Sequence, residues 1–371
     1  GYGGSSHQYS LFRMKNRIAA AVSGGVDSLM AACLLKEQGL SVVGLHFVTG
    51  YEPDSPKHIR PDANLRSSGE IHRLIAQAEK KMKPLASLLG IPIHVLDLSE
   101  DFEKCVVDNF IRTYRAGKTP NPCLVCNPSI KFGTLLHCAK NLGASMVATG
   151  HYARIVKRND NTFHLLKGVD RIKDQSYFLG FMKREQLGAA CFPLGNKTKV
   201  EVKLMAEKRG LVPVTKRESQ DVCFIREKSY GDFLARNFSP EPGEIVDTYG
   251  KVIGGHRGLH LFTVGQRRGI NCPASEPYYV VRIDSKKNRL VVGFKRELLR
   301  TECRVESINW IQEVPKSPFA AQTKVRYRNE ASVSEVFPEG EDAARVRLKS
   351  PGEAMTPGQG AVFYDGEEVI G

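Results

Sequence analysis

The sequence lacks any apolar run long enough to span a bilayer, and it shows neither internal repeats nor low-complexity tracts. We therefore expect no membrane role. A second Cys-x-x-Cys pair is also missing, because only Cys123 and Cys126 among nine cysteines stand at that spacing. An odd number of cysteines scattered through a large chain is unlike the disulfide framework of a small secreted domain, and it favours a reducing cytoplasm.

The opening stretch GYGGSSHQYSLFR has neither an apolar core for secretion nor an initiator Met, so we expect residues 1–16 to be a tail or cloning remnant outside the fold. Acidic residues are fewer than basic ones: the 371 residues include 54 Lys and Arg but only 40 Asp and Glu, which gives a formal net charge of +14. Such a field attracts a polyanion, and nucleic acid is the leading candidate. The alternative is a basic surface that only aids solubility.

The first part of the chain alternates apolar strands with helical patterns, which predicts an α/β domain over 17–228 with a doubly wound parallel sheet. Strands are expected at Arg17–Val22, Leu40–Val48 and Ile91–Ser99, and a fourth ends at Gly150. Helices are expected over 100–116 and 130–142, with the Cys-x-x-Cys pair in a loop between them. Ligands of such sheets bind beyond the carboxyl ends of the strands, so the candidate motifs are expected to share one rim.

From about Tyr230 the sequence pattern changes to short runs of alternating apolar and polar residues, separated by Gly and Pro, as in Tyr278–Asp284 and Asn288–Gly293. These runs predict two small antiparallel β domains, a central one over 229–297 and a C-terminal β-barrel over 298–371. The length of the chain fits two or three domains.

The stretch SGGVDS lies where the first strand feeds a helix, and its paired glycines let backbone N–H groups face an anion. It is not a Walker A loop, because the lysine and the glycine spacing of that motif are absent. The predicted nucleotide-binding residues are Ser23, Gly24, Gly25, Val26, Asp27 and Ser28, with Gly150 and His151 at the end of the fourth strand. Asp27 either helps to place Mg²⁺ or caps the helix.

SGGVDS resembles the PP-loop of the ATP pyrophosphatases, whose fold is the adenine nucleotide hydrolase-like sheet. Further stretches resemble the tRNA 2-thiouridylases, or tRNA-uridine 2-sulfurtransferases, from about Arg17 to the C-terminus. They are YRAGKTPNPCLVCNPSIKF (Tyr114–Phe132), ATGHYAR (Ala148–Arg154), KDQSYFL (Lys173–Leu179), FPLG (Phe192–Gly195), ESQDVCFI (Glu218–Ile225) and GLHLFTVGQRRG (Gly258–Gly269).

The resemblance implies that ATP, with Mg²⁺, adenylates the C2 oxygen of the wobble uridine and that sulfur then displaces AMP. It implies catalytic roles for Asp27, Cys126 and Cys223. Cys223 would carry the sulfur as a persulfide, and Cys126 would release it by forming a disulfide with Cys223 or by taking part in the transfer. A sulfur donor, either sulfide or a persulfide carrier protein, is implied as a partner.

At one position the chain departs from the commoner family pattern Asp-x-x-Cys, because Cys123 stands in place of the aspartate. Cys123, Cys126 and Cys223 are three thiolates, enough to hold a [4Fe–4S] cluster with one open iron. Related thiolases use such a cluster, so sulfide on its open iron is an alternative to the persulfide. A zinc site would need a fourth ligand and ranks below both. The other cysteines are expected to be core thiols without chemistry: Cys33, Cys105, Cys138, Cys191, Cys272 and Cys303.

The tRNA is expected to contact the chain through its anticodon arm, near Tyr114–Lys118. The predicted tRNA-binding residues are Lys173, Asp174, Gln175, Gln266, Arg267 and Arg268. Arg326, Arg328, Arg345, Arg347 and Lys349 alternate with apolar residues and form either a phosphate-binding face or a solvated one. The polar stretch 51–68 is expected to be a lid, a partner site or a disordered loop.

Two rival functions stay open at this stage. One is an amide-forming synthetase built on the same loop, which needs no trio of thiolates. The other is a non-catalytic RNA-binding protein that keeps a relic nucleotide loop. The sequence does not predict the oligomeric state or the identity of the sulfur donor.

Overall fold

The computed structural model describes residues 17–52, 68–211, 213, 222–226, 230–239, 241–353 and 355–371. The predictions for the tail 1–16 and for most of the stretch 51–68 fall outside these residues. The chain forms two compact units. The first takes in the described residues of Gly1–Cys105, Cys123–Phe224 and Glu367–Val369, and the second those of Val106–Pro122, Ile225–Gly366 and Ile370–Gly371.

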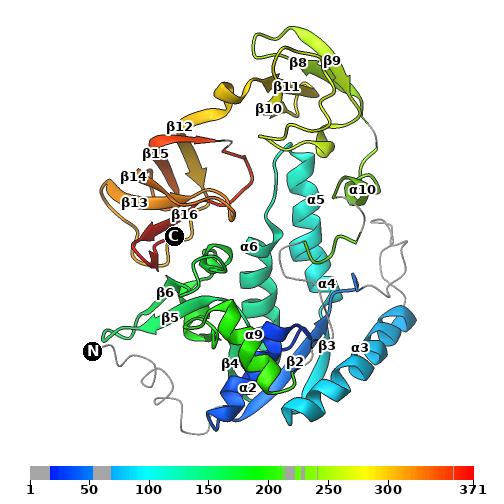
Figure 1. Ribbon diagram of the computed structural model, residues 1–371, viewed down its shortest axis with the longest axis vertical. Helices are drawn as coiled ribbons and strands as arrows, with labels where there is room; N and C mark the ends of the chain where they lie inside the picture. Colours follow the sequence, from blue (N-terminus) through cyan, green and yellow to red (C-terminus); the bar gives the residue numbers. More distant parts are fainter. Residues whose placement is uncertain are drawn as a thin grey trace. The chain divides into compact units, whose positions relative to one another are not determined.

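A five-stranded parallel sheet lies at the centre of the first unit, in the order β3-β2-β1-β4-β7 (Figure 1). Its strands are β1 (Arg17–Ala21), β2 (Val42–Val48), β3 (Ile93–Asp97), β4 (Ala144–Ala148) and β7 (Ala190–Cys191). The chain runs outward from β1 to β3 and then returns to the other side of β1. The sheet is therefore doubly wound, which confirms the predicted fold class, and its switch point falls between β1 and β4.

Three helices share one apolar core with this sheet: α2 (Val26–Glu37), α3 (Ser68–Leu89) and α9 (Lys199–Lys208). Figure 1 shows α2 and α9 next to each other beside the strands. The buried residues Met82, Leu85 and Leu89 recur at helical spacing on α3, and Leu29 and Leu35 of α2 are fully buried. Burying a side chain of this size contributes about 1.5–3 kcal/mol, so this core holds α2, α3 and α9 against the sheet.

The segment with the Cys-x-x-Cys pair is helical, which corrects the expectation of a loop. The first part of the predicted helix 100–116 consists of α4 (Ser99–Phe102) and the π-helix η1 (Glu103–Val107). Further along, three helices follow one another: α6 (Pro122–Cys126), the π-helix η2 (Asn127–Thr134) and α7 (Leu135–Asn141). Pro122 stands at the first helical position, where its missing N–H costs nothing. Pro128 lies inside the run, where a proline ring clashes with the preceding turn, and the helix widens there to the π form.

A hairpin that the sequence patterns did not predict follows β4. Strands β5 (Ala153–Lys157) and β6 (Phe163–Lys167) pair antiparallel, and β17 (Glu368–Val369) pairs with β6. Two short helices, η3 (Ser176–Leu179) and α8 (Arg184–Gly188), lead to β7.

The second unit holds α5 (Asp108–Arg115) and the predicted β-rich part of the chain. Strands β8 (Gly243–Val246), β9 (Val252–His256), β10 (Tyr279–Asp284) and β11 (Arg289–Gly293) form a sheet in the order β10-β11-β8-β9. The outer pairs are antiparallel, and β11 runs parallel to β8. Three short helices accompany this sheet: α10 (Tyr230–Leu234), η4 (Leu259–Leu261) and η5 (Lys295–Leu298).

The C-terminal strands of the second unit pair antiparallel in the order β12-β15-β14-β13-β16. They are β12 (Leu299–Glu306), β13 (Phe319–Lys324), β14 (Ser332–Pro338), β15 (Ala343–Glu353) and β16 (Val362–Asp365). Val336, Val346 and Phe363 are fully buried in their core. Among the described residues, no helix has both the length and the apolarity needed to cross a membrane.

Candidate active site

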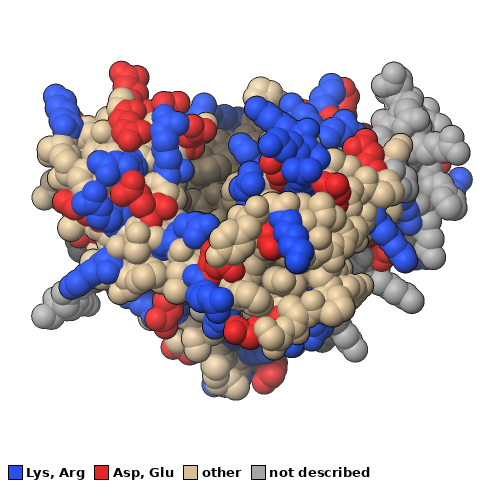
Figure 2. All heavy atoms as spheres, turned by 90° about the horizontal axis from the view of Figure 1, so that it is seen from above, with Lys and Arg blue, Asp and Glu red and all other residues tan. Residues whose placement is uncertain are grey.

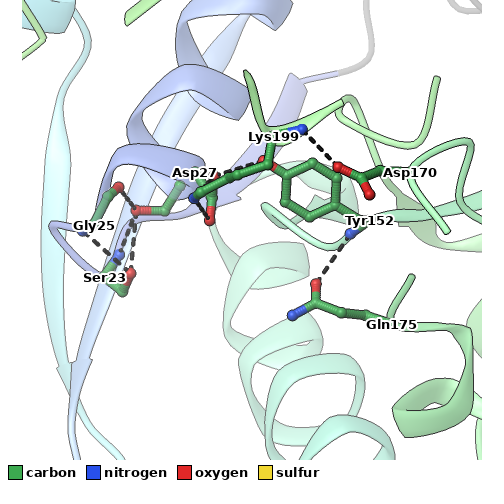
Figure 3. A network of polar contacts seen from close by, with 8 residues as sticks. Ser23, Gly25, Asp27, Tyr152, Asp170, Gln175 and Lys199 are labelled. Atoms are coloured by element: carbon green, nitrogen blue, oxygen red, sulfur yellow. Dashed lines mark hydrogen bonds and ion pairs between the residues drawn. The ribbon is translucent and has the colours of Figure 1, made fainter. Parts of the chain in front are cut away.

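The SGGVDS turn joins β1 to α2 at the switch point of the sheet. Ser28 Oγ donates to Gly25 O at 2.8 Å and accepts a hydrogen bond from Ser23 N at 3.2 Å, and the Ser23 hydroxyl lies 3.1 Å from it (Figure 3). Gly24 has a φ of 84°, which favours glycine. Gly25 caps α2 without a side chain, so the helix begins with uncapped N–H groups. Uncapped N–H groups at a helix N-terminus attract anions, so this geometry is compatible with the phosphate cradle, which stays a prediction.

Asp27 lies in the first turn of α2, and its carboxylate contacts side chains from two other parts of the unit (Figure 3). Lys199 Nζ lies 2.6 Å from each carboxylate oxygen, and the Tyr152 hydroxyl donates to Oδ1 at 2.9 Å. The side chains of Lys199 and Asp27 are only 14% and 29% exposed. Beside this carboxylate the pKa of Tyr152 is raised, first by burial and then by the negative charge of Asp27. The phenol therefore stays a proton donor to Asp27.

Lys199 supplies a cation that the SGGVDS turn itself lacks. It is the first residue of α9, whose N-cap Thr198 forms a capping box with Glu201. Its backbone N donates to Asp170 Oδ2 at 2.9 Å, which fixes the start of the helix. The sequence analysis missed Lys199 and Tyr152. The sequence signal that could have revealed Lys199 is the capping box, because it marks the N-terminus of a helix that follows a strand of the parallel sheet.

Gly150 lies directly against the nucleotide loop. A Cβ atom added at this position would stand 2.8–2.9 Å from the backbone and Cβ of Asp27. No real Cβ contact is that short, so this close approach requires glycine. The predicted proximity of Gly150 to the loop is therefore a feature of the structure.

His151 is buried, and both of its ring nitrogens have partners. Thr149 Oγ1 lies 2.6 Å from Nδ1, and Lys131 Nζ lies 3.3 Å from Nε2. Lysine can only donate, so Nε2 accepts and Nδ1 carries the proton that is donated to Thr149. Burial and the charge of Lys131 hold the pKa of His151 well below its ordinary value. His151 is therefore a neutral side chain, and Lys131 on η2 is a second cation that the sequence analysis missed.

The three predicted thiols lie in the same unit as the nucleotide loop. Cys123 and Cys126 stand on α6, and Cys223 lies on an exposed turn. They are close enough to interact, because charge on Cys123 or Cys223 raises the pKa of Cys126 and charge on Cys123 raises that of Cys223. Cys105, expected to be inert, also raises the pKa of Cys126.

Burial is the main influence on the acidity of these thiols. It raises the pKa of Cys126 to about 12, and that of Cys223 to about 11 although Cys223 itself reaches the surface. The pKa of Cys123 is also raised by burial. The charge of Lys131 acts in the opposite direction on all three. The thiols are therefore protonated at neutral pH, and Lys131 is the cation that favours their ionisation.

Cys123, Cys126 and Cys223 are also the residues that would have to hold an iron–sulfur cluster. Within the described parts of the chain, no group of three or more His, Cys, Asp or Glu side chains is arranged so that it could hold a metal ion. The cysteine trio is close but is not assembled as a ligand set in this arrangement. The cluster stays a prediction.

Three family profiles match successive parts of the chain: the tRNA methyl transferase HUP domain over 16–227, the tRNA methyl transferase PRC-barrel domain over 231–294 and the aminomethyltransferase beta-barrel domain over 300–371. The tRNA-specific 2-thiouridylase MnmA of Desulfosudis oleivorans is 46% identical and is matched over 95% of this chain and 93% of its own. That of Geobacter metallireducens is 41% identical over 97% and 96%. The chain belongs to the tRNA-specific 2-thiouridylase MnmA family.

Among solved structures, NMN synthetase from Francisella tularensis aligns with a TM-score of 0.34 and 14% identity over 61% of this chain and 75% of its own. A likeness at that level supports no argument. The membership in the MnmA family rests on the full-length relatives and the family profiles.

The residues predicted to bind tRNA in this MnmA family member differ in what their side chains do. Asp174 is buried and accepts from the backbone N of Gly168 and of Ser176 at 2.8 and 3.1 Å, and from the Ser176 hydroxyl at 2.9 Å. Its carboxylate therefore orders the turn. Gln175 Oε1 accepts from Tyr152 N at 3.0 Å, and the amide nitrogen of Gln175 points away from Tyr152 (Figure 3). The Lys173 backbone N donates to Asp170 Oδ1 at 3.1 Å.

In the second unit, the polar side chains of the VGQRRG loop have two different roles. Gln266 braces the loop, because its Oε1 accepts from Thr263 N at 3.1 Å and its Nε2 donates to the carbonyl oxygen of Arg268 at 2.9 Å. Arg267 and Arg268 are exposed. These two side chains are the ones that the loop presents to solvent.

The basic residues expected to alternate along the last strands are partly neutralised, and Arg326 and Arg328 lie in a turn after β13 rather than on a strand, which corrects that expectation. Arg345 and Arg347 each lie 3.5 Å from Glu302 and stack on the Phe337 ring. Arg326 donates to the carbonyl oxygen of Val264 at 2.8 Å. Figure 2 shows Lys and Arg side chains interspersed with Asp and Glu on the visible face of the molecule. These contacts favour the solvated or structural alternative for these arginines.

Proposed function

We propose that this chain uses ATP to thiolate C2 of the wobble uridine of tRNA, with residues 17–228 as the catalytic domain, followed by a central β domain over 229–297 that contributes to tRNA binding and a C-terminal β domain over 298–371. The observation that carries the proposal is that a helix N-terminus with Asp27 and Lys199 stands in the same unit as interacting thiols. The full-length relatives are named tRNA-specific 2-thiouridylases. A tRNA substrate and nine free cysteines fit the cytoplasm.

The first step activates the uracil, because its C2 oxygen is a poor leaving group. The C2 oxygen attacks the α-phosphorus of ATP, the bond from that phosphorus to pyrophosphate breaks, and AMP is left on C2. The N–H groups at the start of α2 would hold the pyrophosphate as its charge develops. Mg²⁺ would offset that charge, and the carboxylate of Asp27 and the hydroxyl of Ser23 are oxygen donors of the kind it prefers.

Lys199 is proposed to change partners in this step. Without a nucleotide its ammonium neutralises Asp27. A bound pyrophosphate carries more negative charge than one carboxylate, so the ammonium is drawn to the phosphates while Asp27 is left with the Tyr152 hydroxyl. The lysine that a Walker A loop contributes from its own sequence would thus come from α9.

The second step transfers sulfur through thiol chemistry. The terminal sulfur of a Cys223 persulfide attacks C2 and displaces AMP, which leaves Cys223 joined to C2 through two sulfurs. The Cys126 thiolate attacks Cys223 Sγ, so a Cys126–Cys223 disulfide forms and one sulfur leaves on C2. The two thiols are oxidised as the transferred sulfur is reduced, and an external dithiol restores them. Lys131 supports this step by favouring the Cys126 thiolate.

We derive no step through an iron–sulfur cluster, because the described residues do not form a ligand set. The proposed interface for tRNA keeps Arg267, Arg268, Lys173 and Gln175. We assign Asp174 and Gln266 to the folding of their loops, because their polar atoms are engaged within the protein.

The test supplies an unmodified tRNA transcript, ATP, Mg²⁺ and a persulfide donor, and measures AMP together with 2-thiouridine retained by a mercury gel. We expect both products, and we expect Asp27→Ala to abolish AMP formation while tRNA affinity is largely kept. tRNA binding without tRNA-dependent AMP would favour the RNA-binding rival. Conversion of a small acid without tRNA would favour the amide-forming synthetase.

A further inference from the structure

The turn that carries Cys223 is held by one buried side chain. Of the five residues from Val222 to Arg226, Phe224 alone is buried, at 2% exposure, whereas its neighbour Cys223 is exposed. A reactive thiol on a surface turn needs such an anchor, because backbone freedom would otherwise spread it over many positions. The position of Cys223 therefore depends on what Phe224 contacts.

Phe224 inserts against two aromatic rings of the same unit. Its ring centroid lies 5.8 Å from that of Tyr51 and 5.8 Å from that of Phe102, at interplanar angles of 66° and 75°. Tyr51 and Phe102 are themselves 6.2 Å apart. The two contacts of Phe224 are edge-to-face contacts of the favoured kind, and the Tyr51–Phe102 pair is tilted at 51°. We call these three rings the aromatic clasp.

The clasp is fixed to the scaffold on both sides. Phe102 is the last residue of α4 and is 1% exposed. Tyr51 follows β2, and its hydroxyl donates to Glu103 Oε2 at 2.6 Å. Glu103 opens the π-helix η1, which also holds Cys105. The clasp therefore ties the Cys223 turn to the element whose thiol Cys105 interacts with Cys126.

We propose that Phe224 is a positioning residue for sulfur transfer, which acts by seating Cys223 against the clasp so that Cys223 and Cys126 meet. The inference rests on the proposed function for its role in catalysis. Independently of catalysis, the clasp sets the effective concentration of the Cys126 thiol at the Cys223 thiol. The motif around Cys223 thus contains a reactive residue followed by its anchor.

The first readout is the equilibrium of that pair with glutathione, in which the dithiol and one oxidised glutathione give the disulfide and two reduced glutathiones. The full chain carries Cys123→Ser so that Cys123 does not compete, and the Cys126–Cys223 peptide is quantified by mass spectrometry. We expect Phe224→Ala to lower the equilibrium constant about tenfold or more, because a buried Phe favours the seated turn by at least that factor. Phe224→Leu should restore part of it.

Two further variants separate seating from general destabilisation. Tyr51→Ala opens the clasp from the partly buried side and should lower the constant in the same direction, whereas Tyr51→Phe keeps the ring and should change it less. Phe163→Ala removes a Phe of β6 in the same unit that is not one of the three rings of the clasp, and it should leave the constant unchanged. A constant within about twofold of the parent in Phe224→Ala overturns the proposal.

The second readout is catalysis with all native cysteines present. Phe224→Ala should slow 2-thiouridine formation about tenfold or more and leave tRNA-dependent AMP formation within about twofold, because adenylation does not use Cys223. Equal losses in both would overturn a positioning role. If the parent chain makes no 2-thiouridine at all, the proposed function fails, and the glutathione equilibrium still decides whether the clasp seats Cys223.

Discussion

Replacing Lys199 by Met tests the cation of the nucleotide site, because it removes the charge and keeps most of the apolar stem. The change leaves Asp27 with the Tyr152 hydroxyl as its remaining contact in this network (Figure 3). The Lys199–Asp27 ion pair is only partly buried. The free energy lost when it is broken should therefore lie between about 0–1 kcal/mol, the value for an exposed pair, and about 3–5 kcal/mol, the value for a buried one. We expect the free energy of unfolding to fall by roughly 1–3 kcal/mol.

The catalytic effect of Lys199→Met should exceed the effect on stability. If the ammonium meets the pyrophosphate as it leaves, its loss should slow AMP formation about 10²-fold to 10³-fold, the usual effect of removing one charge-stabilising donor. The assay measures tRNA-dependent AMP at saturating ATP, at a temperature where denaturant curves show the variant folded. tRNA affinity should stay the same.

Matched variants identify the cause of the Lys199 effect. Lys203→Met removes an exposed lysine one turn along α9 and should leave both AMP formation and stability unchanged. Asp27→Asn with Lys199→Met removes the orphaned charge and should recover part of the stability without recovering activity. AMP formation at the parent rate in Lys199→Met would refute the role assigned to this lysine.

Three more outcomes are expected. Cys223→Ser should end thiolation and spare AMP formation; a fully active variant would contradict both sulfur routes. Reversing the charge of Arg267 and Arg268 to Glu should weaken tRNA binding and make its salt dependence shallower, whereas Arg345→Glu should have less effect because Arg345 already pairs with an acid. Alkylation of Cys126 should accelerate with pH up to the region of its raised pKa of about 12, because burial keeps the thiol protonated at neutral pH; a plateau near pH 8 would contradict that assignment.

The α/β architecture could be predicted because buried parallel strands leave a strong local pattern. β1, β2 and β3 lie within predicted apolar runs, and β4 overlaps the predicted fourth strand but begins one residue earlier, at Ala144. The hairpin of β5 and β6 escaped prediction because its residues alternate weakly, and the pairing of β17 with β6 joins segments about 200 residues apart in the chain. Non-local pairing of this kind leaves no signal in one segment.

The cysteine segment shows a different limit of sequence analysis. Cys123 and Cys126 were expected in a loop between two helices, yet Pro122 starts a helix and Pro128 is accommodated by a π turn. Gly133 allows that turn, because a Cβ there would lie 2.8 Å from the carbonyl oxygen of Pro128. The helical outcome depends on an unusual hydrogen-bond register that proline spacing alone does not reveal.

The candidate site was predicted where chemistry is concentrated in a motif and missed where it comes from elsewhere in the chain. The nucleotide loop and Gly150 lie together as expected. Lys199 and Lys131 are single lysines in ordinary helical sequence, and only the fold brings them to Asp27 and His151. Conversely, Asp174 stands within a motif, but burial commits it to its own turn.

The most direct measurement of the central claim is anaerobic thiolation of an unmodified tRNA transcript with ATP. Metal-free protein given a persulfide donor is compared with cluster-reconstituted protein given sulfide, and 2-thiouridine is scored in both arms. The thiol route predicts turnover by the metal-free protein, with a Cys126–Cys223 disulfide that accumulates when no reductant is present. Product from the reconstituted protein alone would contradict that route and assign Cys123, Cys126 and Cys223 to a cluster.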